Sequence, residues 1–262
     1  MFPLVPVPPP AEFALFTLVL GRMAGMFSAI PLFGGRSVPT RIKAATVFAM
    51  ALVFFPLVRA KLPQLPADPV SLGLLVVRET LVGLSLGLLA QVIFSAVEFC
   101  GQIIGTQMGF TASTLFDPTM GAQVSTMSVL QNLIATLLFM TLGLHHVFIR
   151  AIVESYGIVP VGGWQMSGEL FRFVVAATTG VFILAIKLAA PVMASILAAT
   201  MALGVMARAF PQMNIFMLSF PLNIGLGLII LGVTLQVFMR TLGQSFDGLG
   251  QQITALLRIL GG

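Results

Sequence analysis

The chain has 262 residues, of which 58% are hydrophobic and 8% are charged, and its mean hydropathy is +1.07. Soluble domains carry roughly 25% charged residues, so this composition excludes a soluble protein and indicates an integral membrane protein. The net charge of +5 comes from Lys and Arg residues scattered singly or in pairs, which excludes the basic stripe of a nucleic-acid-binding protein.

Apolar blocks of helical length follow one another along the chain, and glycine and proline separate most of them. Two runs without any charged residue, 118–144 and 209–239, each exceed the roughly 20 residues that a helix needs to cross a bilayer. Because the blocks are apolar on every face, they lack the alternation of a membrane β-barrel. The sequence therefore predicts an all-α polytopic membrane protein, a single unit of about six long, partly kinked helices. Their approximate ranges are 13–33, 44–58, 70–97, 119–144, 173–207 and 214–239.

The third block contains Gly83-Leu84-Ser85-Leu86-Gly87, which matches the G-x-S-x-G elbow of serine hydrolases. Asp117 and His145 follow in the chain order that the hydrolase fold uses. The elbow, however, needs a strand that turns sharply into a helix, whereas Ser85 stands inside a continuous apolar run of helical length. Ser85 is therefore expected to hydrogen-bond within its own helix or to a neighbour, and no enzymatic activity is predicted.

Polar residues interrupt the apolar pattern between positions 99 and 127. Such a segment is tolerated at membrane depth only when it is buried in protein or lines water. Gly101, Gly105 and Gly109 lie four residues apart there, so on a helix they share one face and form a candidate surface for close helix packing. The alternative is that glycine is simply frequent in membrane helices.

His145 and His146 are adjacent, so on a helix they diverge by about 100° and cannot both reach one metal ion. No Cys, Asp or Glu stands three or four residues from either histidine, and no metal site is predicted. The sequence also lacks a glycine-rich phosphate loop of the G-x-x-x-x-G-K type. No cofactor is expected.

Lys187 lies midway in the fifth apolar block, and Pro191 cannot donate a hydrogen bond to the carbonyl of Lys187. Lipid exposure would cost the lysine roughly 2.5 to 3.5 kcal/mol, so its side chain is expected to face protein or water. A proton or ion relay is the functional alternative, and a buried pairing or a kinked hairpin is the structural one.

Several longer motifs run through most of the chain in order. From position 101 the sequence reads GQIIGTQMGF, then FDPTMGAQ, a long apolar stretch, LGLHH and ESYGIVPVG. From position 203 it reads LGVMARAFPQMNIFMLSFPLNIGLG, and near the N-terminus RMAGMF, IPLFG and VPTRIK also fit. In these motifs the chain resembles the FliR family of flagellar export-gate proteins and, more distantly, the equivalent subunit of injectisome type III secretion systems. The pair His145-His146 departs from the single histidine expected in the family.

The resemblance implies a subunit of the gate through which unfolded rod, hook and filament proteins leave the cytoplasm, located in the inner membrane at the flagellar basal body. It implies a FliP-like part over 1–172 and a FliQ-like helical hairpin with a C-terminal tail over 173–262. FliP- and FliQ-like subunits would close the pore with this chain, and FlhA- and FlhB-like proteins and unfolded flagellar substrates would be further partners. The residues assigned to the hairpin turn are Arg208, Pro211, Gln212 and Asn214.

The family's lumen-closing loop falls, by position, on the polar segment described above. Apolar side chains there would seal the lumen against ions and still yield to a passing chain, because such contacts are unspecific and can repack. Gly109 and Pro118 would set the bends of this plug loop. The residues assigned to the plug loop are Gln107, Met108, Gly109, Phe110, Leu115, Phe116, Asp117 and Pro118.

Two alternatives remain open. One is an injectisome export-gate subunit, although the motif R-A-F-P-Q-M-N favours the flagellar system. The other is a polytopic transporter of ions or small solutes, which predicts paired interrupted helices in two related halves. No such internal repeat is visible in the sequence.

Overall fold

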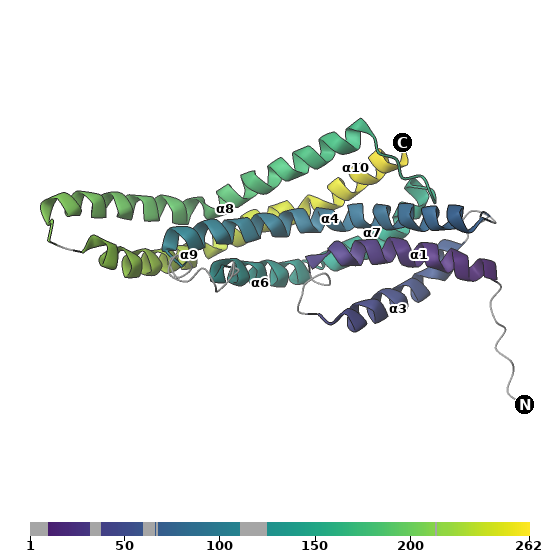
Figure 1. Cartoon of the computed structure of the whole chain (residues 1–262), viewed down its shortest axis with the longest axis horizontal. Helices are drawn as coiled ribbons and strands as arrows, with labels where there is room; N and C mark the ends of the chain where they lie inside the picture. The colour runs from purple at the N-terminus through teal and green to yellow at the C-terminus, as the bar shows by residue number, and fades with distance from the viewer. Residues whose placement is uncertain (1–9, 32–37, 60–65, 67, 111–124, 213) are drawn as a thin grey trace, which may run out of the picture. The chain divides into compact units, whose positions relative to one another are not determined.

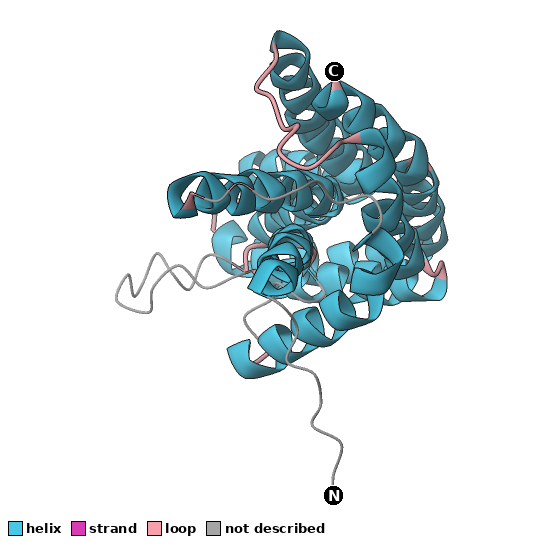
Figure 2. Ribbon diagram, turned by 90° about the vertical axis from the view of Figure 1, so that its right-hand side faces the viewer, coloured by secondary structure: helices cyan, strands magenta, loops and turns pink. Residues whose placement is uncertain are grey.

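The computed structural model describes residues 10–31, 38–59, 66, 68–110, 125–212 and 214–262. Over these residues the chain forms helices joined by loops, and no strand occurs among them (Figure 2). The helices labelled in Figure 1 are α1 (Pro10–Ala29), α3 (Thr40–Val58), α4 (Pro69–Met108), α6 (Thr126–Thr141), α7 (Leu144–Ile158), α8 (Gly168–Ala209), α9 (Ile215–Asp247) and α10 (Leu249–Gly261).

The described helices provide up to six candidate membrane spans. Helices α1, α3, α4 and α8, and the segment that begins in α9 and continues into α10, are each long and apolar enough to cross a bilayer. Helices α6 and α7 together form a sixth candidate, a broken span that bends by 64°. The prediction of an all-α polytopic membrane protein with about six apolar helices is confirmed.

Two boundaries differ from the sequence prediction. α4 continues through the polar segment as far as Met108, because its polar side chains are satisfied without breaking the helix: the Thr106 hydroxyl donates a 2.8 Å hydrogen bond to the Gln102 carbonyl. The apolar run at 119–144 was predicted as one helix, but α6 ends at Thr141. Gly143 has a left-handed φ of 67°, which ends one helix and lets α7 begin in a new direction.

α4 begins with a complete N-terminal cap. Asp68 precedes Pro69, which lacks the N–H that would otherwise be left unpaired in the first helical turn. The Asp68 carboxylate accepts hydrogen bonds from the Ser71 backbone N–H at 2.9 Å and from the Ser71 hydroxyl at 3.0 Å. These bonds, the backbone one first, hold the pKa of Asp68 below its ordinary value.

The chain divides into two compact units that interleave along the sequence. The first unit comprises Met1–Gln91, Gly143–Ala177 and Gly248–Gly262, and the second comprises Val92–Leu142 and Thr178–Asp247. The long helices α4 and α8 therefore each contribute to both units.

Each unit has its own apolar core. In the first unit α1 packs against α3, α3 against α7, and α7 against α10. In the second unit α6 packs against α9. The rings of Phe94, Phe139 and Phe246 meet in that second core, with centroids 5.7 to 5.9 Å apart, mostly in edge-to-face arrangements.

The C-terminal tail contains an amphipathic helix, α10, that was not among the helices predicted from the sequence. Only one face of α10 is apolar, so the helix does not register as a continuous block, although its spacing of i, i+4, i+7, i+8 and i+11 carries the signal. This face packs against α7 within the first unit. Its buried residues are Leu249, Ile253, Leu256, Leu257 and Leu260.

Candidate functional site

A buried ion pair joins α1 to α4 in the first unit. Arg22 and Glu79 are 0% and 1% exposed, and Arg22 Nε donates a 2.7 Å hydrogen bond to Glu79 Oε2. The other guanidinium nitrogens donate to the Ser155 hydroxyl at 2.8 Å and to the Val159 carbonyl at 3.2 Å. The guanidinium carbon also lies 3.9 Å from the centroid of the Tyr156 ring. Burial of the charge is tolerated because the arginine is paired and hydrogen-bonded.

The second oxygen of the Glu79 carboxylate holds the loop that follows α7. Glu79 Oε1 accepts a 3.0 Å hydrogen bond from the Gly162 N–H, and Arg78 donates to the Gly162 carbonyl at 3.0 Å. Gly162 has a φ of 77°, which favours glycine at this position. The motifs RMAGMF and ESYGIVPVG, far apart in the sequence, therefore meet in one hydrogen-bond network.

This network was not predicted from the sequence, although its signal is present there. The first apolar block contains one arginine, Arg22, and the third contains one glutamate, Glu79. Charged side chains inside apolar blocks are costly, so two of opposite sign are candidates for pairing. Only the tertiary structure shows that they pair with each other.

Glycines allow the backbones of α1 and α4 to approach closely beside this ion pair. A Cβ added at Gly83 would overlap the main-chain carbonyl of Arg22, and one added at Gly87 would overlap the carbonyl of Met26. Small residues at such positions are the usual means of close helix packing in membranes. The site of the ion pair is therefore set by a tight helix crossing as well as by charge.

α4 ends in a Schellman motif at the start of the predicted plug loop. Gly109 has a φ of 87°, and its N–H donates a 3.1 Å hydrogen bond to the Thr106 carbonyl. The Phe110 N–H donates to the Gly105 carbonyl at 3.0 Å. A Cβ at Gly109 would lie 2.7 Å from the ring of Phe220 in α9, so both φ and space favour glycine here.

The described part of the plug loop is only partly exposed. Gln107 is exposed and Phe110 is half-buried. Met108 is fully buried, and a Cβ at Gly227 of α9 would lie 2.7 Å from Met108 Cγ. The remaining assigned residues lie outside the described residues, and the plug role stays a prediction. They are Leu115, Phe116, Asp117 and Pro118.

The glycine face of α4 lies against α6 within the second unit. A Cβ at Gly101 would overlap the backbone of Ser128, and one at Gly105 would overlap the hydroxyl of Ser125. The Ser128 hydroxyl donates to the Glu98 carbonyl at 2.9 Å, and the Ser125 hydroxyl donates to the Gly101 carbonyl at 3.3 Å. These contacts are internal to the chain, and a role of this face in binding other subunits stays a prediction.

The residues assigned to the hairpin turn lie where α8 gives way to α9. α8 ends at Ala209 and α9 begins at Ile215. The Asn214 side-chain oxygen accepts a 3.2 Å hydrogen bond from the Met217 N–H and so caps the start of α9. All four assigned residues, Arg208, Pro211, Gln212 and Asn214, are exposed.

Two of the three residues considered above for a hydrolase, Ser85 and His145, are described by the structure, and the third, Asp117, lies outside the described residues. Ser85 lies within the continuous helix α4, and its hydroxyl donates to the Leu81 carbonyl at 2.8 Å. The rings of His145 and His146 lie 3.9 Å apart between centroids at the start of α7. Among the residues that the structure describes, no group of three or more His, Cys, Asp or Glu side chains could hold a metal ion.

Comparison with known proteins gives the chain its relatives. The family described as bacterial export proteins, family 1, matches residues 13–249. The chain is 33% identical over 252 residues to the flagellar biosynthetic protein FliR of Bacillus subtilis strain 168, covering 95% of this chain and 96% of the relative. It is 32% identical over 219 residues to FliR of Escherichia coli K12, covering 82% and 81%. It is also 30% identical over 218 residues to FliR of Caulobacter vibrioides, covering 83% and 87%. The chain therefore belongs to the FliR family of bacterial export proteins, and it is a membrane-embedded component of flagellar protein export.

Proposed function

We propose that the chain is a subunit of the flagellar export gate in the inner membrane, at the flagellar basal body. With FliP- and FliQ-like subunits it would form the pore through which unfolded rod, hook and filament proteins leave the cytoplasm. Residues 1–172 would act as a FliP-like part, and residues 173–262 as a FliQ-like hairpin with a tail. FlhA- and FlhB-like export proteins would be further partners. The chain would form part of the wall of this pore and would catalyse no covalent reaction.

The observation that carries this proposal is the poor burial of α8 and α9. In an apolar 18-residue window of each span, 56% of residues are buried in α4 and 39% in α1, but only 28% in α8, 17% in α3 and 11% in the span that begins in α9. Large apolar side chains on these two helices therefore need lipid or other protein subunits to cover them. The exposed side chains include Phe182, Ile183, Ile186, Leu197 and Met201 of α8, and Leu228, Ile229, Val233 and Val237 of α9.

Polar groups on these exposed surfaces favour protein over lipid as the cover. Lys187 of α8 and Gln236 of α9 are both exposed, within helices that are otherwise strongly apolar. Hydrocarbon offers neither side chain a hydrogen-bond partner, and a charged group there is especially costly. Sister subunits of an export gate would supply such partners.

Copurification tests the proposed function directly. When the chain is expressed with FliP- and FliQ-like proteins of the same organism and extracted in mild detergent, we expect it to purify with them as one complex. If the chain instead purifies alone and moves ions or a small solute in lipid vesicles without companions, the transporter alternative holds. If the chain copurifies with injectisome subunits in preference to flagellar ones, the injectisome alternative holds.

Shortening the loop tests the plug. Deleting residues 111–116 should raise the ion conductance of the assembled gate in planar bilayers, because the apolar side chains assigned to the seal would be lost. Replacing Leu115 and Phe116 together by serine keeps the length of the loop and should also raise conductance. A matched replacement of Thr111 and Thr114 by serine should leave it unchanged. Unchanged conductance in the deletion variant would refute the plug role.

A further inference from the structure

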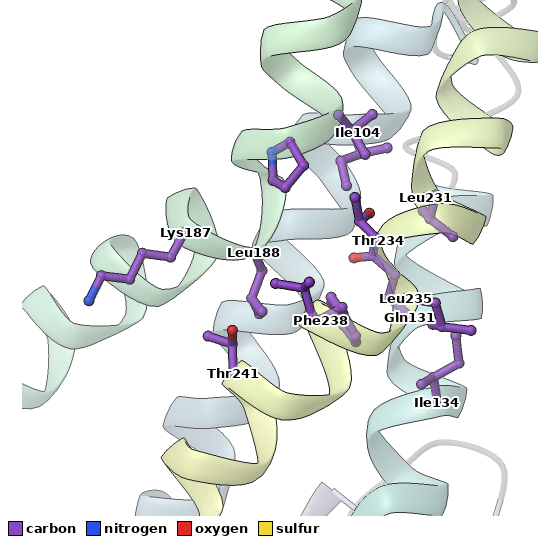
Figure 3. A pocket seen from close by; sticks show the side chains of 13 residues that line it. Ile104, Gln131, Ile134, Lys187, Leu188, Leu231, Thr234, Leu235, Phe238 and Thr241 are labelled. Atoms are coloured by element: carbon purple, nitrogen blue, oxygen red, sulfur yellow. The ribbon is translucent and has the colours of Figure 1, made fainter.

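Lys187 presents its ammonium group on the open side of α8. The neighbouring residues Leu188 and Val192 are 6% and 2% exposed and, with Pro191, line a small cavity of about 20 Å³ within the second unit. Helices α4, α6 and α9 provide the other walls of this cavity. Lys187 also lines this cavity, but Figure 3 shows its side chain extending away from it towards the ammonium group, whereas Leu188 points towards it. The lysine is exposed, although its backbone belongs to the best-packed stretch of α8.

The surface around the ammonium group is apolar. Ile183 and Ile186, which precede Lys187 in the helix, are 49% and 53% exposed. Ala190 and Ala194, one and two helical turns after Lys187, are also exposed. Alanines leave room for a neighbouring helix to come close to the lysine. The face therefore combines a close-approach surface with one charge.

No charged group of this helix is near enough to neutralise the lysine. The next charged residues on α8 are Arg172 and Arg208, 15 and 21 positions away, and both are basic. At 1.5 Å per residue these distances are about 22 and 32 Å, so the lysine stem cannot carry its ammonium group to either end of the helix. Within the described part of the chain the ion pairs are Arg22 with Glu79 and Arg59 with Glu12, and Lys187 belongs to neither.

We propose that Lys187 forms an ion pair with an Asp or Glu on an apolar helix of a sister subunit, and that this pair fixes the height at which the two helices meet. The inference rests on the proposed function, since it requires a second subunit against α8. A carboxylate is the partner that matches an ammonium group in charge and hydrogen bonding once both are removed from water. Apolar contacts alone would allow the helices to slide along each other, because such contacts are not directional. One paired charge on each helix removes that freedom, as a single polar position does in coiled coils.

Zero-length crosslinking of the purified complex tests the contact. A hydrophobic carbodiimide activates a carboxylate, which the Lys187 amine then attacks to form an amide bond while the carbodiimide leaves as a urea. We expect a covalent product of this chain with a sister subunit, and peptide mass spectrometry should locate one end at Lys187. The matched control is Lys187→Arg, which keeps the ion pair but forms no amide, so the complex should assemble fully and the product should disappear. A product that joins Lys187 to Asp117, Glu98 or Asp247 of the same chain, or to a second copy of this chain, would overturn the proposal.

Charge reversal gives an independent result. Lys187→Glu should lower the yield of copurified sister subunits at least about tenfold, because two carboxylates would face each other out of water. The yield of the chain expressed alone should not change, since the side chain is exposed there. Replacing the crosslinked carboxylate of the partner by lysine should restore assembly of Lys187→Glu. If the wild-type chain copurifies with its sisters but Lys187→Glu does so equally well, this inference fails and the proposed function stands. If the wild-type chain does not copurify, the proposed function fails first.

Discussion

Arg22 and Glu79 form a buried, hydrogen-bonded ion pair in the first unit. Both side chains are buried, and each makes further hydrogen bonds to α7 or to the loop after it. Neither charge can be left alone without a large desolvation penalty, so the pair acts as one structural element. It joins α1, α4 and α7, three helices that apolar packing alone would not place in a unique register.

Single substitutions in this pair should be much more damaging than the double substitution. Arg22→Met or Glu79→Leu should each destabilise the folded chain by about 3 to 5 kcal/mol, because each leaves a buried charged group unpaired. The double variant Arg22→Met with Glu79→Leu should lose less than the sum of the two single losses. Unfolding in mixed detergent, followed by circular dichroism, provides the double-mutant cycle. Additive losses would show that the two residues do not act together.

At the scale of helices, α4 shows how one segment can serve both units. Its first half carries Gly83 and Gly87 against α1, and its second half carries Gly101 and Gly105 against α6. Between an N-terminal cap at Asp68 and a Schellman motif at Gly109 the helix is continuous. The Asp68 cap and the Gly109 Schellman motif set the two ends of α4, although the helix becomes more polar towards its C-terminus.

Two glycines of α4 offer a matched test of close helix packing. Gly83→Ala should destabilise the chain, since the new methyl group would overlap the Arg22 carbonyl and push α1 away. Gly73→Ala lies in the same helix, where a Cβ meets nothing within 4 Å. This control should be neutral or stabilising by about 1 kcal/mol, as alanine favours helix more than glycine does. Thermal unfolding in detergent and swimming of the two variants compare them, and equal behaviour would show that the α1–α4 crossing tolerates a side chain.

At the scale of the whole molecule, burial differs widely between helices: α4 is well buried, whereas α3, α8 and α9 are poorly buried. The ion-pair network lies in the first unit, whereas α8 and α9 each leave many large apolar side chains exposed. A protein with this distribution is expected to be incomplete as a monomer, because a continuous apolar surface with isolated polar groups needs a matching cover. This property is what the export-gate proposal requires.

Cysteine labelling can measure that cover. The only native cysteine, Cys100, is buried, so a maleimide should report an introduced cysteine with little background. Val233→Cys, at a position that is 75% exposed, should react quickly in the chain alone and at least about tenfold more slowly in the complex with sister subunits. Leu242→Cys, at a position of 0% exposure, should react slowly in both states. Equal labelling of Val233→Cys before and after assembly would show that this face of α9 does not bind a sister subunit.

The sequence by itself determined the class of fold, the number of spans and the family. Long uncharged runs cannot remain in water, and Gly and Pro between these runs act locally, so the spans could be counted without a structure, although the end of α4 at Met108 was not predicted. The motifs predicted the FliR family, and the comparison with known relatives confirms this prediction. The plug loop, the partner subunits and the division at residue 172 remain predictions from the resemblance.

Only the tertiary structure decided which residues of distant segments meet. It paired Arg22 with Glu79, placed Gly101 against Ser128, and turned Lys187 outwards while its neighbours face a cavity. Apolar membrane helices are alike on most faces, so periodicity does not reveal which face is buried inside the chain and which is left for other subunits. Pairing of charges and overlap of backbones depend on three-dimensional distance, and the order of residues along the chain does not contain that distance.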